Sequence, residues 1–175
     1  ALRLSGIVRD CATTELQGML TSATNKLEQN LGETITVQTS DWNGGNLITP
    51  NASRKPFEEV RVRKALMLAI DQWGSSEALS KIANVHTVGG IVFPCSPLAA
   101  TKQALPKMAV FWPDLNKSRT EAKLLLQKAR IHDLPFELLN LHVAPPYQFL
   151  LCCLIYHWTK FGLPSRPRLL PPAPL

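Results

Sequence analysis

The stretch NASRKPFEEVRVRKALMLAID, residues 51–71, carries the clearest structural signal in the sequence. Residues 51–56 form a polar run without a hydrophobic period. Glu58 and Glu59 follow, where the dipole of a helix favours negative charge. Apolar side chains then recur with the spacing of one buried helical face: Val62, Ala65, Leu66, Ala69, Ile70 and Trp73. The pattern predicts a loop followed by a helix that ends at Gly74, with Arg61, Arg63 and Lys64 largely off the buried face.

Upstream of this stretch, the sequence predicts a helix between strands. Thr14 and Gln17 have the spacing of a capping box at the start of that helix, and Gly32 can end it. Residues 34–39 alternate with period two and are rich in β-branched side chains, so they are predicted to form a strand. A turn at 43–46 and a short strand at 47–49 complete this part.

Downstream, the predicted order is a short helix capped by Ser75 or Ser76, a mostly irregular stretch at 84–115, and then helix, strand, helix and strand. A capping box at Ser118 and Glu121 would open the first of these helices, with Ala122, Leu125, Leu126 and Ala129 on its apolar face. Residues 136–141 are predicted to be a strand and residues 146–161 a helix that Gly162 ends. The proline-rich residues from 164 allow an edge strand at best. This alternation is typical of an α/β fold with βαβ units.

Composition excludes several classes of protein. The 175 residues are 45% hydrophobic and 18% charged, which indicates a globular chain. The net charge is +6, but basic residues are spread out rather than interleaved with aromatics, so no nucleic-acid partner is expected. No apolar run is long enough to span a membrane. Because the chain begins with Ala1, it is expected to be a processed protein or a fragment.

The residues that could carry chemistry show no diagnostic spacing. The four histidines and four cysteines include no CxxC pair, and the sequence has neither a GxSxG elbow nor a phosphate loop. We therefore expect no catalytic residue, no metal and no cofactor. Adjacent Cys152 and Cys153 are interpreted as buried small hydrophobic residues in a helix. Trp73 and Trp158 are expected in the core, whereas Trp42 and Trp112 lie in loops, where an aromatic side chain often binds a ligand.

Residues 51–71 also resemble the signature of the family 5 extracellular solute-binding proteins, N-x-x-x-x-P-F-[DE]-[DE]-V-R-V-R-x-A-[LI]-x-x-A-I-D, with nearly every fixed position filled. These proteins are the peptide and nickel receptors of bacterial ABC importers. Residues 93–99 are similar to a proline-rich loop of the family. The segment Trp158–Leu163 is similar to the end of one of its helices. The first fifty residues, from Leu4 onward, are also similar to the segment that leads to the hinge in this family. The chain departs from the family at Ile7, Arg9 and Cys95, and throughout residues 142–175.

The resemblance implies part of a periplasmic-binding-protein type II fold. Residues 1–45 would end lobe one, residues 46–56 would cross the hinge, residues 57–163 would begin lobe two, and residues 164–175 would be an irregular proline-rich tail. Since family members are much longer, with ligand-reading segments that have no counterpart here, the chain is expected to be an incomplete fragment. Family membership also implies a periplasmic or extracytoplasmic location.

The function implied by the resemblance is that of a non-enzymatic solute-binding receptor component, which in the full-length parent would bind a small solute or an oligopeptide. The importer's membrane permease would be its protein partner. The expected ligand-binding residues are Trp42, Asn43, Phe93, Pro94, Cys95 and Ser96. Segment 93–97 would border the cleft between the lobes or, alternatively, form a rigid surface connection. The alternative function is a stand-alone interaction module derived from the lobe, without transport activity.

Overall fold

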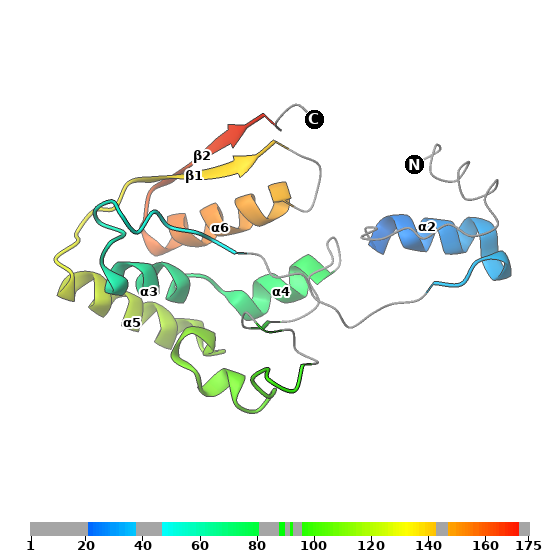
Figure 1. Cartoon of the computed structure of the whole chain (residues 1–175), viewed down its shortest axis with the longest axis horizontal. Helices are drawn as coiled ribbons and strands as arrows, with labels where there is room; N and C mark the ends of the chain where they lie inside the picture. Colours follow the sequence, from blue (N-terminus) through cyan, green and yellow to red (C-terminus); the bar gives the residue numbers. More distant parts are fainter. Residues whose placement is uncertain are drawn as a thin grey trace.

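The chain is a mixed α and β protein (Figure 1). The computed structural model describes residues 21–37, 47–80, 88–89, 92, 96–142 and 147–171. In chain order, the described elements are α2 (Thr21–Leu31), the 3-10 turn η1 (Gly32–Thr34), α3 (Val60–Leu68), α4 (Gln72–Ser80), the 3-10 turns η2 (Leu105–Lys107) and η3 (Ala109–Phe111), α5 (Leu115–Lys128), β1 (Phe136–Leu141), α6 (Tyr147–Phe161) and β2 (Ser165–Leu170).

The C-terminal third is a βαβ unit, as the sequence predicts. β1 and β2 pair in parallel, in register from Phe136 opposite Ser165 to Leu141 opposite Leu170. The connecting helix α6 packs against both strands and lies below the sheet in Figure 1. Gly162, with φ of 95°, ends α6 in the left-handed conformation that glycine allows without strain.

The edge strand that the sequence allows from residue 164 is confirmed as β2, so the tail at 164–175 is not irregular over Ser165–Leu170. The backbone of Ser165–Leu170 pairs in parallel with β1. Pro167 is tolerated because, among the described residues, β2 has a neighbouring strand on one side only, and an edge strand can spare an N–H group.

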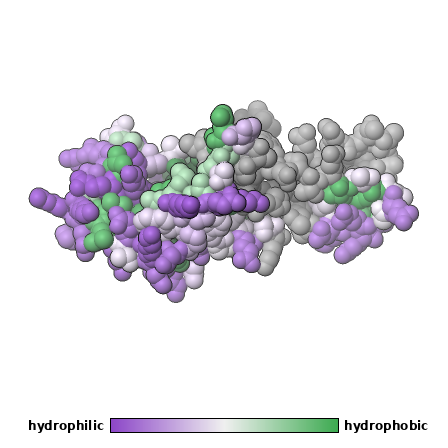
Figure 2. All heavy atoms as spheres, turned by 90° about the horizontal axis from the view of Figure 1, so that it is seen from below, coloured by the Kyte–Doolittle hydropathy of each residue, from purple (hydrophilic) through white to green (hydrophobic). Residues whose placement is uncertain are grey.

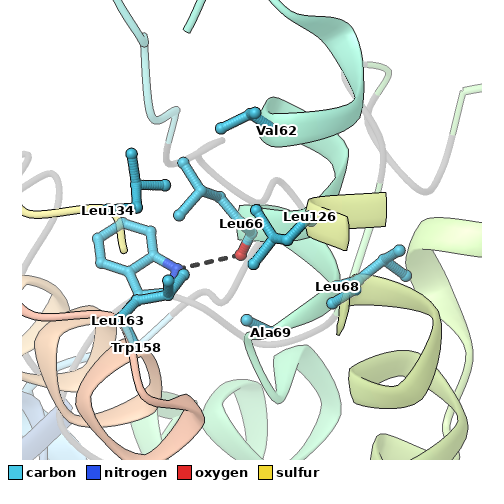
Figure 3. Close-up of a cluster of buried hydrophobic side chains, with 10 residues drawn as sticks. Val62, Leu66, Leu68, Ala69, Leu126, Leu134, Trp158 and Leu163 are labelled. Carbon is cyan, nitrogen blue, oxygen red and sulfur yellow. Dashed lines mark hydrogen bonds between the residues drawn. The ribbon is translucent and has the colours of Figure 1, made fainter. Parts of the chain in front are cut away.

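The hydrophobic core lies between α3, α5, α6 and the start of β1 (Figure 3). Trp158 of α6 is 1% exposed and stands edge-on to Phe136, with ring centroids 5.0 Å apart. Its indole N–H donates to the carbonyl of Leu66, at 3.0 Å (Figure 3). That carbonyl belongs to the last turn of α3, where helix carbonyls lack a partner within the helix. The buried core residues are Val62, Ala65, Leu66, Leu68, Ala69, Ala122, Leu126, Leu134, Trp158 and Leu163.

The buried face predicted for α3 is confirmed at Leu66, which is 7% exposed, while Arg61 and Lys64 are exposed. Ile70 and Trp73 are only half-buried. Both lie outside α3, which ends at Leu68, and Trp73 belongs to α4.

Gly74 does not end the helix, contrary to the prediction. The Asp71 carboxylate accepts a hydrogen bond from the N–H of Gly74 at 2.9 Å, and the Asp71 carbonyl accepts from Ser75. Because an aspartate in this position satisfies a free N–H of the first helical turn, a new helix begins directly after it. Gly74, Ser75 and Ser76 therefore lie inside α4.

A second aspartate sets the start of α5. The Asp114 side chain accepts a hydrogen bond from the N–H of Lys117 at 3.0 Å, so α5 begins at Leu115 rather than at the predicted capping box. Ser118 is consequently inside the helix and buried. The apolar face is confirmed, because Ala122 and Leu126 are buried and Leu125 and Ala129 are half-buried.

The predicted strands at 34–39 and 47–49 are wrong where they can be observed. Residues 32–34 form η1, residues 35–37 have no regular structure, and 47–49 are irregular although Ile48 packs on the core. A β-branched alternation needs a neighbouring strand to take its hydrogen bonds, and the described residues provide none there. The end of α2 at Gly32, with φ of 50°, is as predicted. The Thr14 capping box and the turn at 43–46 lie outside the described residues.

Candidate functional site

Of the six expected ligand-binding residues, only Ser96 lies within the described residues. Trp42, Asn43, Phe93, Pro94 and Cys95 lie outside them. Ser96 is half-buried and closes a turn, where its hydroxyl accepts a hydrogen bond from the N–H of Leu98 at 3.3 Å. Its carbonyl accepts from the N–H of Ala99 at 3.0 Å. The placement of segment 93–97 relative to a cleft therefore stays a prediction.

The charged residues of the 51–71 stretch bind the chain itself. The Arg61 guanidinium donates to both carboxylate oxygens of Glu59, at 2.9 Å each, and to the backbone carbonyl of Lys128 at 3.0 Å. The side-chain hydrogen bonds from Arg61 lower the pKa of Glu59 from its ordinary 4.5 to about 2. The bidentate pair lies at the start of α3, and the bond from Arg61 to the Lys128 carbonyl joins it to the end of α5.

Arg63 holds the preceding turn in the same way. Its guanidinium donates to the carbonyls of Phe57, at 2.6 Å, and Glu58, at 2.9 Å. The Phe57 ring meets Phe136 of β1 edge-on, with centroids 5.9 Å apart. We call Glu59, Arg61 and Arg63 the α3 clamp. Its cations are used by backbone carbonyls and by Glu59, so the clamp fixes the loop before α3 rather than offering a ligand site.

A polar cluster lies between α4 and α6. The Ser75 hydroxyl is 2.9 Å from Nε2 of His157, and the thiol of Cys153 donates to the Ser75 hydroxyl at 3.1 Å. His157 is 9% exposed, and its Nδ1 has no hydrogen-bond partner among the described residues. We call these three residues the Ser-His-Cys cluster. It joins the side-chain types used in nucleophilic chemistry: a thiol, a hydroxyl and an imidazole.

Burial holds the imidazole of the cluster in its neutral form. Desolvation lowers the pKa of His157 from its ordinary 6.5; the nearby Asp71 carboxylate acts in the opposite direction, and the Arg119 guanidinium lowers the pKa further. A neutral imidazole at pH 7 is able to accept a proton.

The sequence did not predict this cluster, because Ser75 is 82 positions from His157 and 78 from Cys153. One signal was present: Cys153 and His157 are four residues apart in a helix and so share one face. The interpretation of both cysteines as buried is wrong, since Cys152 is exposed and Cys153 is half-buried.

The remaining candidate residues that the structure describes give no second site. His132 and His142 are exposed. Trp112, an expected loop aromatic, packs against the core, and the Lys117 ammonium lies 4.1 Å above its ring centroid. Its ring is therefore already in contact with other residues of the chain. Among the described residues, no group of three or more His, Cys, Asp or Glu side chains could hold a metal ion.

The outer face of the sheet carries exposed apolar side chains beside charged ones. Leu139 is 57% exposed, and its neighbours Glu137 and Arg168 form an ion pair at 3.4 Å. Figure 2 looks from below, from the side away from the sheet, and shows mostly hydrophilic side chains with small hydrophobic groups between them over the described part of that side. We call the outer face of β1 and β2 that carries Glu137, Leu139 and Arg168 the sheet face.

Comparison with known proteins adds no relative: no protein-family model matches the chain, and no curated protein matches it. Among the helices of the described residues, none has the length and apolar character needed to cross a membrane.

Proposed function

We propose that this chain is a solute-binding receptor component of a bacterial ABC importer, with an oligopeptide as its solute. The observation that carries the proposal is the α3 clamp. Glu59, Arg61 and Arg63 occupy fixed positions of the signature that residues 51–71 resemble, and each has a bonded partner in the chain. The hydrogen bonds that these side chains make at the junction between the loop and α3 give a physical reason for those residue types at that spacing.

The proposed mechanism is closure of two α/β lobes around the solute, without chemical change to it. The βαβ unit, with α3 and α5, would belong to the second lobe of a periplasmic-binding-protein type II fold. The loop before α3 would connect to the hinge, and the clamp would keep that connection rigid, so that lobe movement is confined to the hinge. Trp42, Asn43 and residues 93–96 would contact the solute.

The genes beside this one provide the first test. A receptor component is expected next to genes for a membrane permease and its ATPase. A gene standing alone, without either partner on the same transcript, would contradict the transport proposal.

Calorimetric titration of the chain with a mixed oligopeptide pool, and separately with nickel, is the second test. We expect no saturable heat, because receptors of this class gain affinity by enclosing the solute between two lobes. The proposal places the described unit on one side of the cleft only. Saturable heat at micromolar ligand would show instead that this chain alone is a complete binding unit.

The sheet face favours a second candidate function, an interaction module that pairs with another copy of itself. Leu139 is exposed beside Glu137 and Arg168, and across a twofold axis those opposite charges would face each other. Sedimentation velocity over a range of concentrations tests this candidate. A dimer that Leu139→Ser abolishes and Leu124→Ser on α5 preserves would support it, and a monomer at all concentrations would exclude it.

A further inference from the structure

We propose that Cys153 is a reactive thiol that exchanges with low-molecular-weight disulfides, with Ser75 and His157 as the relay that takes its proton. The inference is independent of the receptor proposal, since it rests on the contacts of the Ser-His-Cys cluster alone.

The direction of the hydrogen bonds carries the first step. The Cys153 thiol donates to the Ser75 hydroxyl at 3.1 Å, which leaves the Ser75 proton free to point to Nε2 of His157 at 2.9 Å. When Ser75 donates to Nε2, the three groups form one continuous path from the thiol to the imidazole. Proton transfer along hydrogen bonds of this length is the ordinary mode of general-base catalysis.

The surroundings of His157 suit an acceptor of that proton. Burial lowers the pKa of His157, so the ring is neutral and its Nε2 lone pair is available. Asp71 is the nearby charge that favours the imidazolium once it forms, while Arg119 opposes it. The Tyr156 ring lies edge-on to the imidazole, with centroids 5.4 Å apart.

The unpaired nitrogen of the ring is the second observation. In the neutral tautomer that accepts at Nε2, Nδ1 bears the hydrogen, and the described residues leave that buried group without a partner. A buried polar atom left unpaired is costly in a purely structural cluster and calls for an explanation. What a histidine supplies here and an apolar residue would not is Nε2, which lies 2.9 Å from the Ser75 hydroxyl and is the nitrogen that takes the proton.

The exchange step balances. As the Cys153 proton passes to Ser75, the Ser75 proton passes to His157, giving a thiolate and an imidazolium. The thiolate sulfur attacks one sulfur of a disulfide R–S–S–R, so that the Cys153–S–S–R bond forms and the original S–S bond breaks. The leaving thiolate takes the proton back from the imidazolium. Cys153 is oxidised and one half of the disulfide is reduced, without a further reactant. The half-buried position of Cys153 leaves part of the residue open to a small reagent.

The experiment measures mixed-disulfide formation with oxidised glutathione at pH 7, resolved by mass spectrometry of peptides. Because Cys152 and Cys153 are adjacent, the rates are read separately in the variants Cys152→Ser and Cys153→Ser. Exposed Cys152 is the internal control, since no described contact links it to the relay.

The decisive variant is Ser75→Ala. It removes the hydroxyl that links the two groups and keeps both the Cys153 thiol and the His157 imidazole. We expect it to slow exchange at Cys153 about a hundredfold, the low end of what a general base contributes, and to leave Cys152 unchanged. Ser75→Thr keeps a hydroxyl and should retain the Cys153 rate. Circular dichroism and urea unfolding check that each variant is folded.

Two results with the Ser75 variants would overturn the proposal. One is a Cys153 rate that Ser75→Ala leaves unchanged, and the other is a loss of rate that is as large for Ser75→Thr as for Ser75→Ala. A variant that fails to fold leaves the pH profile of the unaltered chain as the deciding measurement. The Cys153 rate should there fall more steeply than that of Cys152 once the pH drops below the lowered pKa of His157, because the imidazole becomes protonated. A Cys153 profile with the same shape as that of Cys152 would equally refute the relay.

Discussion

Replacing Trp158 with phenylalanine should destabilise the fold by about 3–4 kcal/mol. The change keeps an aromatic ring at the centre of the core but removes the indole N–H that reaches the Leu66 carbonyl at 3.0 Å. Trp158 is 1% exposed, so water cannot take over that bond. A buried carbonyl left without a donor costs about 1–3 kcal/mol. The smaller ring also gives up contacts worth about two buried methylene groups, at about 0.8 kcal/mol each.

The matched control is Trp73→Phe. The Trp73 indole also donates to a backbone carbonyl, that of Phe111 at 2.9 Å, but Trp73 is only half-buried. Water can therefore replace the lost donor in part, and we expect a cost of about 1 kcal/mol. The two variants each remove a hydrogen bond from an indole N–H to a backbone carbonyl, and they differ mainly in how deeply that bond is buried.

Urea unfolding followed by far-ultraviolet circular dichroism measures both costs. With a slope of about 1–3 kcal/mol per molar urea, the Trp158 variant should shift the midpoint by about 1 M or more. Equal shifts for the two variants would show that burial does not set the cost of the bond. A shift near zero for Trp158→Phe would refute the arrangement of the core itself.

Further perturbations test the other elements. Leu66→Ala should cost about 2–5 kcal/mol in urea unfolding, against less than about 0.5 kcal/mol for Leu124→Ala on the exposed side of α5; similar costs would contradict the buried face. Asp71→Ala should cost about 1 kcal/mol in thermal unfolding while Asp71→Asn, which keeps the capping oxygen, should cost little; a loss shared by both would mean that the cap is not what matters. The pKa of Glu59 is lowered to about 2, so its contribution is present above pH 4.5 and is lost as pH falls toward 2. Glu59→Gln should make the urea midpoint depend less on pH over that range, and an unchanged pH dependence would argue against the ion pair in solution. The pKa of His157 is lowered from 6.5, so the unfolded state binds protons first and stability should fall as pH drops below 6.5. His157→Gln should reduce this dependence, and an equal dependence in the variant would assign it to another group.

The sequence by itself determined the elements whose signals are local. The strand at Phe136–Leu141, the helix that follows it and its stop at Gly162 were predicted correctly, because alternation, an apolar helical period and a C-terminal glycine each act within a few residues. The exposure of Arg61 and Lys64 beside buried Leu66 follows in the same way from helical periodicity.

The sequence also contains capping residues that outweigh the apolar period at two helix boundaries. Asp71 and Asp114 are good N-cap residues, yet the predicted boundaries followed the apolar period to Gly74 and the capping box to Ser118. In both places the aspartate decides, because it satisfies a free N–H at the first turn.

Only the tertiary structure decided which distant groups meet. The strand signals at 34–37 and 47–49 failed because strand pairing needs a neighbour, whereas Ser165–Leu170 became a strand despite its proline because β1 lies beside it. The bond from Trp158 to the Leu66 carbonyl spans 92 positions, and the contact between Ser75 and His157 spans 82. No periodicity encodes such separations. They arise when burial of apolar faces brings α3, α4 and α6 together, and polar groups that this packing places side by side then bond to one another.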